Sequence, residues 1–325
     1  MLKFDKLKIV STLNSVISNS PEIYQQIKKN GKLIKETFCS TSPSLLYVEM
    51  NIVQNEIIVE FTGKLLCDSY PSLINQCNII ECLQRVQEIG DVMIDIDTFV
   101  DNAQIVKADV CLDVSYPDCK ALTQSLYTHI SNHKKYLARK MGDNLVIEKN
   151  VKSKGRKRRL TVYDKGREMK LATNRDFLLF VNERNILNYF SDKVRFELNL
   201  NSKEQIRQAL KISDTSIHSV MASEASPIWE FLDIVIGDDE GRVENCSTLA
   251  ELKNQLVLDY CDGDLAKVEA LLRGYCSPKT HISQAMKPYR ELSAKQLSGD
   301  IPPNIKQRLR ELLMEIAILL GLVSI

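Results

Sequence analysis

The sequence predicts an α+β fold, with a central, largely antiparallel sheet, flanking helices and a helical C-terminal region. Three segments alternate apolar and polar residues, which is the period-two pattern of a half-buried strand: Val106–Ser115, Arg158–Lys165 and Lys193–Asn201. Beyond about Ser213 only helical patterns remain. We therefore predict two domains, an α+β domain over residues 1–212 and a helical domain over residues 213–325.

The remaining elements follow from local signals. Roughly eight strands are expected in the first 200 residues, including Lys3–Val10, a hairpin of Leu45–Val53 with Glu56–Thr62, Val92–Asp97, and Asn144–Lys149 paired with Arg158–Lys165. Helical spacing of apolar residues, with proline or serine near the start, predicts helices over Pro71–Ile89, Pro117–Arg139, Ser202–Leu210 and Pro303–Leu320.

Composition indicates a soluble globular protein, because 44% of the 325 residues are apolar and 26% are charged. The start of the chain lacks the apolar run and cleavage site of a signal peptide, and the longest apolar run, Leu312–Ile325, is too short to span a bilayer. Nine cysteines without a CxxC pair fit reduced thiols better than zinc or disulfides. We expect a cytoplasmic protein that does not associate with membranes.

Charge is concentrated in one segment. Residues 151–175 contain ten Lys and Arg against two acidic residues, a charge of +8, so the rest of the +1 chain carries −7. Six of these cations form a basic turn: Lys152, Lys154, Arg156, Lys157, Arg158 and Arg159. A solvated loop is one explanation. We favour DNA-backbone contact, since six cations in eight residues repel one another without a polyanion.

The polar faces of the three alternating strands carry the chemistry. Asp109, Asp113 and Glu197 are carboxylates, which as a group suit Mg²⁺ or Mn²⁺. Tyr163 lies on the polar face of its strand and is a candidate nucleophile. Lys165 and Arg195 are cations that could bind a phosphate. All six residues lie on the three alternating strands. Taken singly, a strand tyrosine usually packs and strand acids are usually solvated. The assignment therefore depends on the three strands being neighbours.

In order and spacing, the segments KADVCLDVS, RRLTVYDKGRE and KVRFELNLNS resemble the central motifs of the filamentous-phage gene II replication initiators, the gene II/X family of phages and plasmids. The resemblance covers most of residues 1–210 and is weaker over the helical tail. It implies rolling-circle initiation: an endonuclease nicks one strand at an origin, becomes linked to the 5′ phosphate through tyrosine, and later rejoins the displaced strand. The chain lacks a second tyrosine beside Tyr163, which argues against a two-tyrosine scheme.

Carried over by motif, the resemblance makes Tyr163 the nucleophile, Asp109 and Glu197 the metal carboxylates, and Lys165 and Arg195 the phosphate-handling cations. Asp113 is a third candidate metal ligand. The implied partners are double-stranded origin DNA, the displaced single strand, and a host helicase and polymerase in a bacterial cytoplasm, with a homodimer left open. Two alternatives remain: a mobilisation relaxase of the same chemistry, and a non-catalytic origin-binding repressor or copy-control protein.

Overall fold

The computed structural model describes residues 1–39, 44–116, 118–129, 136–149, 158–236, 264–275 and 281–299, together with residues 254, 257 and 261. These residues divide into two compact units. The first contains nearly all described residues up to Leu232, and the second contains those from Asp233 onward, with Thr128 and His129. The predicted boundary between residues 212 and 213 stays a prediction.

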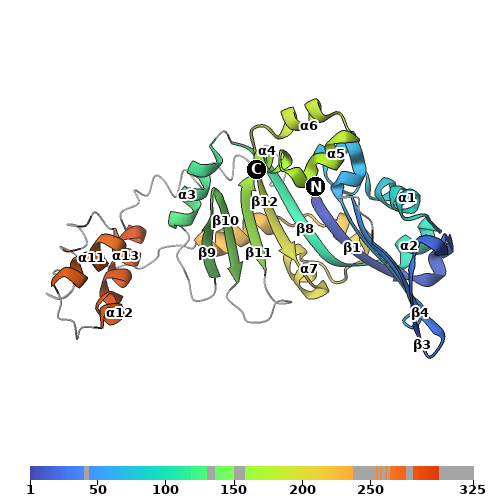
Figure 1. The fold of residues 1–325 in the computed structure, drawn as a ribbon, viewed down its shortest axis with the longest axis horizontal. Helices are drawn as coiled ribbons and strands as arrows, with labels where there is room; N and C mark the ends of the chain where they lie inside the picture. Colours follow the sequence, from blue (N-terminus) through green and yellow to red (C-terminus); the bar gives the residue numbers. More distant parts are fainter. Residues whose placement is uncertain are drawn as a thin grey trace. The chain divides into compact units, whose positions relative to one another are not determined.

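A ten-stranded sheet organises the described part of the first unit, and every neighbouring pair in it is antiparallel (Figure 1). In sheet order the strands are β3 (Gln25–Lys29), β4 (Lys32–Phe38), β5 (Leu45–Asn51), β6 (Glu56–Thr62), β1 (Phe4–Thr12), β8 (Gln104–Ser115), β12 (Lys193–Leu200), β11 (Arg159–Asp164), β10 (Asn144–Lys149) and β9 (Tyr136–Met141). A separate pair joins β2 (Val16–Asn19) and β7 (Val92–Ile94). The first strand of the chain therefore lies inside the sheet.

Helices flank this sheet. They are η1 (Leu13–Ser15), η2 (Pro21–Ile23), η3 (Gly63–Ser72), α1 (Ile79–Gly90), α2 (Ile96–Asn102), α3 (Cys119–His129), α4 (Lys165–Met169), η5 (Ala172–Asn174), α5 (Arg175–Leu179), α6 (Glu183–Phe190), α7 (Lys203–Leu210), α8 (Ile217–Met221) and α9 (Pro227–Ile236). A buried cluster joins η3, α4, α5 and α6 to Cys111 of β8. These four helices therefore cover one end of the sheet face on which Cys111 lies.

The second unit is helical throughout its described part, with α11 (Leu265–Tyr275), α12 (Ile282–Ala285) and α13 (Lys287–Gly299). Its core is a small cluster that includes Val268, Met286 and Leu292. The predicted helix over Pro303–Leu320 lies outside the described residues. Among the helices that the structure describes, none has the length and apolarity required to cross a bilayer.

The predicted fold class is confirmed: the structure has a large antiparallel sheet with flanking helices and a helical C-terminal region. The β5–β6 hairpin and the β10–β11 pair are also confirmed. Two helix predictions are wrong in extent. α1 begins at Ile79, because the backbone of Ile74 exchanges two hydrogen bonds with Phe4 instead of continuing a helix. α3 ends at His129, and residues 136–139 belong to β9, which pairs with β10.

Candidate active site on the sheet

The three alternating strands are neighbours, as the site assignment requires, with β12 between β8 and β11. The register places their polar residues in three cross-strand rows: Asp113, Arg195 and Tyr163; Cys111, Glu197 and Thr161; and Asp109, Asn199 and Arg159. Residues that oppose one another on adjacent antiparallel strands point to the same face. The predicted nucleophile and carboxylates therefore share one face of the sheet.

A chain of hydrogen bonds links the tyrosine to both candidate metal carboxylates. The Tyr163 hydroxyl donates to Oε2 of Glu197 at 3.0 Å. The amide of Asn199 donates to Oε1 of Glu197 at 3.1 Å and to Oδ1 of Asp109 at 2.7 Å. Arg159 orients this amide, since its Nε donates to the Asn199 Oδ1 at 3.1 Å. The two carboxylates are thus held on either side of one neutral amide.

Little positive charge compensates this pair of carboxylates. Burial raises the pKa of Asp109, although Lys6, at 3.3 Å from its Oδ2, and the Asn199 amide act in the opposite direction. Burial also raises the pKa of Glu197, and the charges of Asp5 and Asp109 add to that effect. The pKa of the Tyr163 phenol lies well above its ordinary value because of burial and the neighbouring Glu197. This end of the polar face is therefore electrostatically favourable for an added cation.

The other end of the face is fully compensated. Arg195 is completely buried, and its Nε and Nη2 donate to the two oxygens of Asp113 at 2.6 and 2.7 Å. Its Nη1 donates to Asp5 at 2.9 Å and to the Tyr70 hydroxyl at 3.1 Å. Burial opposes ionisation of Asp5, but Arg195, Lys165 and the Tyr70 hydroxyl outweigh it and hold the pKa of that carboxyl at about 2. Asp113 is therefore engaged by Arg195, not placed with Asp109 and Glu197.

Lys165 is also buried, at 2% exposure, and donates to Glu168 at 2.6 Å. Its ammonium lies 5.4 Å from the Tyr70 ring centroid and 5.9 Å from that of Tyr163. The next residue, Gly166, fixes this position, because a Cβ there would lie 2.5 Å from the carbonyl oxygen of Phe190. The Lys165 ammonium therefore lies beside the Tyr163 ring, inside the protein and away from solvent.

The predicted basic turn is described only at its end. Arg158 is half-buried and donates to Gln208, and Arg159 is the exposed residue that orients Asn199. Lys152, Lys154, Arg156 and Lys157 lie outside the described residues. The DNA-binding role of the turn stays a prediction.

Within the described residues, no group of three or more His, Cys, Asp or Glu side chains is arranged to hold a metal ion. The donor chemistry still fits Mg²⁺ or Mn²⁺, because such ions are commonly held by one or two carboxylates and complete their shell with water and substrate phosphate. Asp109 and Glu197 provide two hard oxygen donors with raised pKa values. A bound divalent ion would relieve the repulsion between them.

Several residues of this network were not among the predicted site residues. Asn199 could have been found, since it lies two residues beyond Glu197 on the same alternating face. Asp5, Lys6 and Tyr70 had no such signal, because β1 and η3 reach the site through tertiary structure alone. Lys64 belongs with them: it donates to Asn174 at 2.6 Å, and burial together with Lys165 lowers its pKa.

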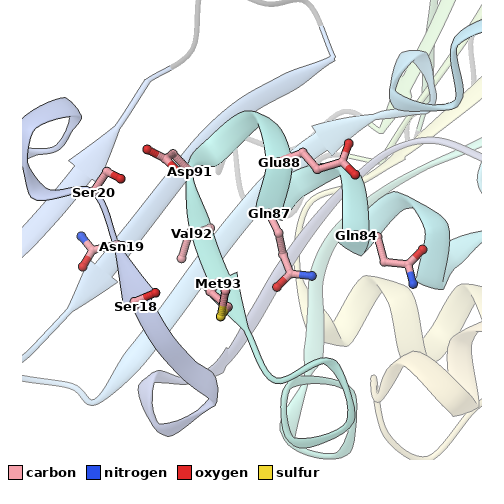
Figure 2. A pocket seen from close by; sticks show the side chains of 9 residues that line it. All are labelled: Ser18, Asn19, Ser20, Gln84, Gln87, Glu88, Asp91, Val92 and Met93. Carbon is pink, nitrogen blue, oxygen red and sulfur yellow. The ribbon is translucent and has the colours of Figure 1, made fainter.

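An open pocket lies elsewhere, between the β2–β7 pair and α1 (Figure 2). Its lining is mostly polar: Ser18, Asn19, Ser20, Gln84, Gln87, Glu88, Asp91, Val92 and Met93. Gln87 has a structural role there, since its Oε1 accepts from the backbone N–H of Ile94 at 2.6 Å. None of the predicted site residues lines this pocket.

No family model and no curated protein matches the chain. Among solved structures, the chain is similar to a rolling circle replication initiator protein from Geobacillus stearothermophilus. The identity is 14%, the match covers 72% of this chain and 97% of that chain, and the TM-score is 0.31. At that TM-score the two backbones differ too much for the likeness to support a conclusion about this chain.

Proposed function

We propose that the protein is a rolling-circle replication initiator, a metal-dependent DNA endonuclease and strand transferase that uses Tyr163 as its nucleophile. The observation that carries the proposal is the hydrogen bond from the Tyr163 hydroxyl to Glu197, which shares the Asn199 amide with Asp109. A tyrosine that merely packs does not require two carboxylates on the adjacent strands. The resemblance of the three motifs to gene II/X initiators supports the same assignment.

The reaction is a transesterification. The Tyr163 oxygen attacks the scissile phosphorus, an O–P bond forms between tyrosine and the 5′ phosphate, and the bond from phosphorus to the 3′ oxygen breaks. Glu197, which already accepts the phenolic hydrogen bond, is the first acceptor of the tyrosine proton, and the departing 3′ oxygen takes up a proton to become a hydroxyl. The reverse reaction rejoins a strand. Because the phosphoester bond is conserved, ATP is not needed.

Asp109 and Glu197 would hold the Mg²⁺ or Mn²⁺, which would supply positive charge for the developing phosphorane. Asp113 is excluded from our ligand set, because both of its oxygens accept from Arg195. Arg195 lies opposite Tyr163 on the neighbouring strand, and the Lys165 ammonium lies 5.9 Å from the Tyr163 ring centroid; both residues are buried, and both place positive charge near the tyrosine. We treat them as positioning residues.

The proposed function implies the substrates, the compartment and the host partners. Double-stranded origin DNA and the displaced strand are the substrates, and the bacterial cytoplasm is the compartment. A host helicase separates the strands, and a host polymerase extends the 3′ hydroxyl. Residues 1–212 form the catalytic and DNA-binding domain in this proposal.

A covalent adduct tests the proposal directly. Wild-type protein, Mg²⁺ and supercoiled DNA that carries the element's own origin should give nicked circles, with the protein attached to the 5′ end after denaturation. Mass spectrometry of the digested adduct should place the DNA on Tyr163. A Tyr189→Phe variant is the matched control, since Tyr189 lies on α6 and is 39% exposed.

Three outcomes would change the assignment. An adduct on another tyrosine, such as Tyr116 or Tyr189, would mean that the motif has been read in the wrong register. Origin binding without any adduct would favour the non-catalytic repressor or copy-control protein. Nicking of a transfer origin, in place of a replication origin, would favour the mobilisation relaxase.

A further inference from the structure

The β3–β4 hairpin at the edge of the sheet is built differently from the other strands. All five residues of β3 are exposed, so no layer covers this strand on either face. β4 pairs with β5 only from Lys35 to Phe38, and its first residues extend beyond that neighbour. In Figure 1 the hairpin projects past the rest of the sheet. It contributes little to the core.

The tip of the hairpin is a tight, basic turn. Asn30 and Gly31 both have positive φ, at 52° and 75°, as a two-residue type I′ turn requires. Three exposed lysines surround the turn: Lys28, Lys29 and Lys32. In the part of the chain that the structure describes, none of the three forms an ion pair. The nearby acid Glu36 accepts hydrogen bonds from Gln26 and Asn19 instead.

Two of these lysines oppose each other directly. The register pairs Lys29 with Lys32 across the hairpin, and like charges in opposite positions of an antiparallel pair are destabilising. Lys28 adds a third charge on the other face of the hairpin, since consecutive strand residues point to opposite faces. The opposition of Lys29 and Lys32 lowers the stability of the free hairpin, and a polyanion in contact with their ammonium groups would remove that penalty.

We propose that the tip of this hairpin, Lys28, Lys29 and Lys32, contacts the phosphate backbone of double-stranded DNA. This inference rests on the proposed function for its choice of polyanion. The contact is separate from the active site and from the basic turn before β11. It supplies affinity without reading bases, because ammonium groups on flexible side chains bind phosphates as point charges.

The hairpin tip and Tyr163 lie at opposite ends of the strands. The cross-strand row that contains Lys35 ends at Thr12, the last residue of β1, whereas the row of Tyr163 passes through Asp113, beyond Phe4 at the start of β1. The tip therefore contacts a different part of the duplex from the one that contains the scissile phosphate.

A structural explanation competes with this one. Lysines on an exposed edge strand also prevent the pairing of that edge with another chain. If this were their only role, their removal would cause self-association and would leave DNA binding unchanged. The experiment must therefore measure both properties.

The test compares three variants by fluorescence anisotropy, using a duplex of about 30 bp, or three turns, over a range of salt concentrations. The triple variant K28Q/K29Q/K32Q removes the charge. K28E/K29E/K32E keeps a charged edge that resists pairing but repels phosphate. K120Q/K203Q/K287Q removes three exposed lysines elsewhere and is the matched control. Light scattering reports the oligomeric state of each protein.

The hairpin variants should bind more weakly, and the slope of log affinity against log salt should fall by about 0.9 for each lost contact, or about 2.7 for three. The control variant should keep the wild-type slope. Nicking of a short single-stranded oligonucleotide should be unchanged in all variants, which separates this inference from the proposed chemistry. Unchanged slopes in both hairpin variants would overturn the inference, and self-association of the glutamine variant alone would then assign the lysines to edge protection.

Discussion

Asp109 and Asp113 lie four residues apart on β8 and on the same face, yet their surroundings are opposite. Asp113 gives both oxygens to the buried guanidinium of Arg195. Asp109 shares one amide with Glu197, and burial raises its pKa despite Lys6. The negative charge at the Asp113 end is neutralised by Arg195, whereas the carboxylates at the Asp109 end have little positive charge near them.

The difference separates architecture from chemistry. Paired charges around Arg195 join β1, β8 and β12, and their removal should destabilise the protein. The carboxylates near Tyr163 cost stability in the free protein, so their presence calls for a ligand. The two ends should therefore respond oppositely to mutation, metal and pH.

The largest effect is expected at the nucleophile. Tyr163→Phe removes the only attacking oxygen, so nicking should fall by at least about 1,000-fold. Stability should change by only about 1 kcal/mol, since a single hydrogen bond to Glu197 is lost. Single-turnover nicking and urea unfolding measure the two quantities. Residual adduct formation by the folded variant would show that another nucleophile operates.

Activity at the Asp109–Glu197 end should depend on a divalent metal ion. Nicking should stop in EDTA, and Glu197→Gln should lower it by at least about 100-fold, the upper range for residues that merely support a metal ligand. Mn²⁺ should raise the melting temperature of the wild type but have little effect on the Glu197→Gln variant. Glu204→Gln, on the exposed surface of α7, is the control. Full activity in the chelator would remove the metal from the mechanism.

The compensated end should dominate stability instead. Arg195→Met leaves the carboxylates of Asp113 and Asp5 without their counter-ion, which we expect to cost about 3–5 kcal/mol of unfolding free energy. Arg184→Met, on the exposed surface of α6, should cost almost nothing. Urea unfolding compares them. Equal midpoints would mean that Arg195 does not anchor the three strands.

The two ends should also differ in their response to pH. The pKa of Asp5 lies at about 2 against an ordinary 3.8, so its contribution of about 2 kcal/mol is present above pH 3.8 and is lost as the pH falls toward 2. The pKa of Asp109 is raised in the folded protein, so its contribution to stability is present below the ordinary carboxyl pKa of 3.8. That contribution is lost as the pH rises through the raised pKa of the folded protein. Asp5→Asn should flatten the acid side of the stability profile, and Asp109→Asn the side above the ordinary carboxyl pKa. The opposite pattern would reverse our assignment of the two ends.

The smallest effects are expected at the end of the basic turn, where the adjacent residues Arg158 and Arg159 should behave differently. Arg158→Ala and Arg159→Ala should each reduce the salt slope of DNA binding by about 0.9. Only Arg159→Ala should also slow nicking at saturating DNA, because Arg159 orients the Asn199 amide between the carboxylates. Equal nicking rates in the two variants would show that the amide keeps its orientation without Arg159.

Alternation in the sequence was enough to predict which residues share a face, because a strand has a fixed period of two. It placed Tyr163, Glu197 and Asp109 each on the polar face of its own strand. The pairing and register in the structure then bring these three polar faces to the same side of the sheet. It could not predict β1 as the neighbour of β8, since the choice of partner strands is set by the whole sheet. Asp5 and its ion pair with Arg195 were missed for that reason.

Other misses have local causes. Residues 136–139 fit a helical pattern equally well, and only pairing with β10 makes them a strand. The β3–β4 hairpin was not predicted, although its Asn30-Gly31 pair is a strong turn signal. Burial of Lys165 and Arg195 could not be predicted from alternation, because it depends on tertiary packing that includes Tyr70 of η3, which is distant in sequence from both residues.

The position of β1 inside the sheet has a consequence for synthesis of the protein. The hydrogen bond from Arg195 to Asp5 joins residues 190 positions apart, and that from Asn199 to Asp109 joins residues 90 positions apart. Contacts between such distant residues form late in folding. The network around Tyr163 therefore cannot assemble on the ribosome until β12 has emerged. An unfinished chain should therefore lack the complete set of side chains around Tyr163 until synthesis has passed β12.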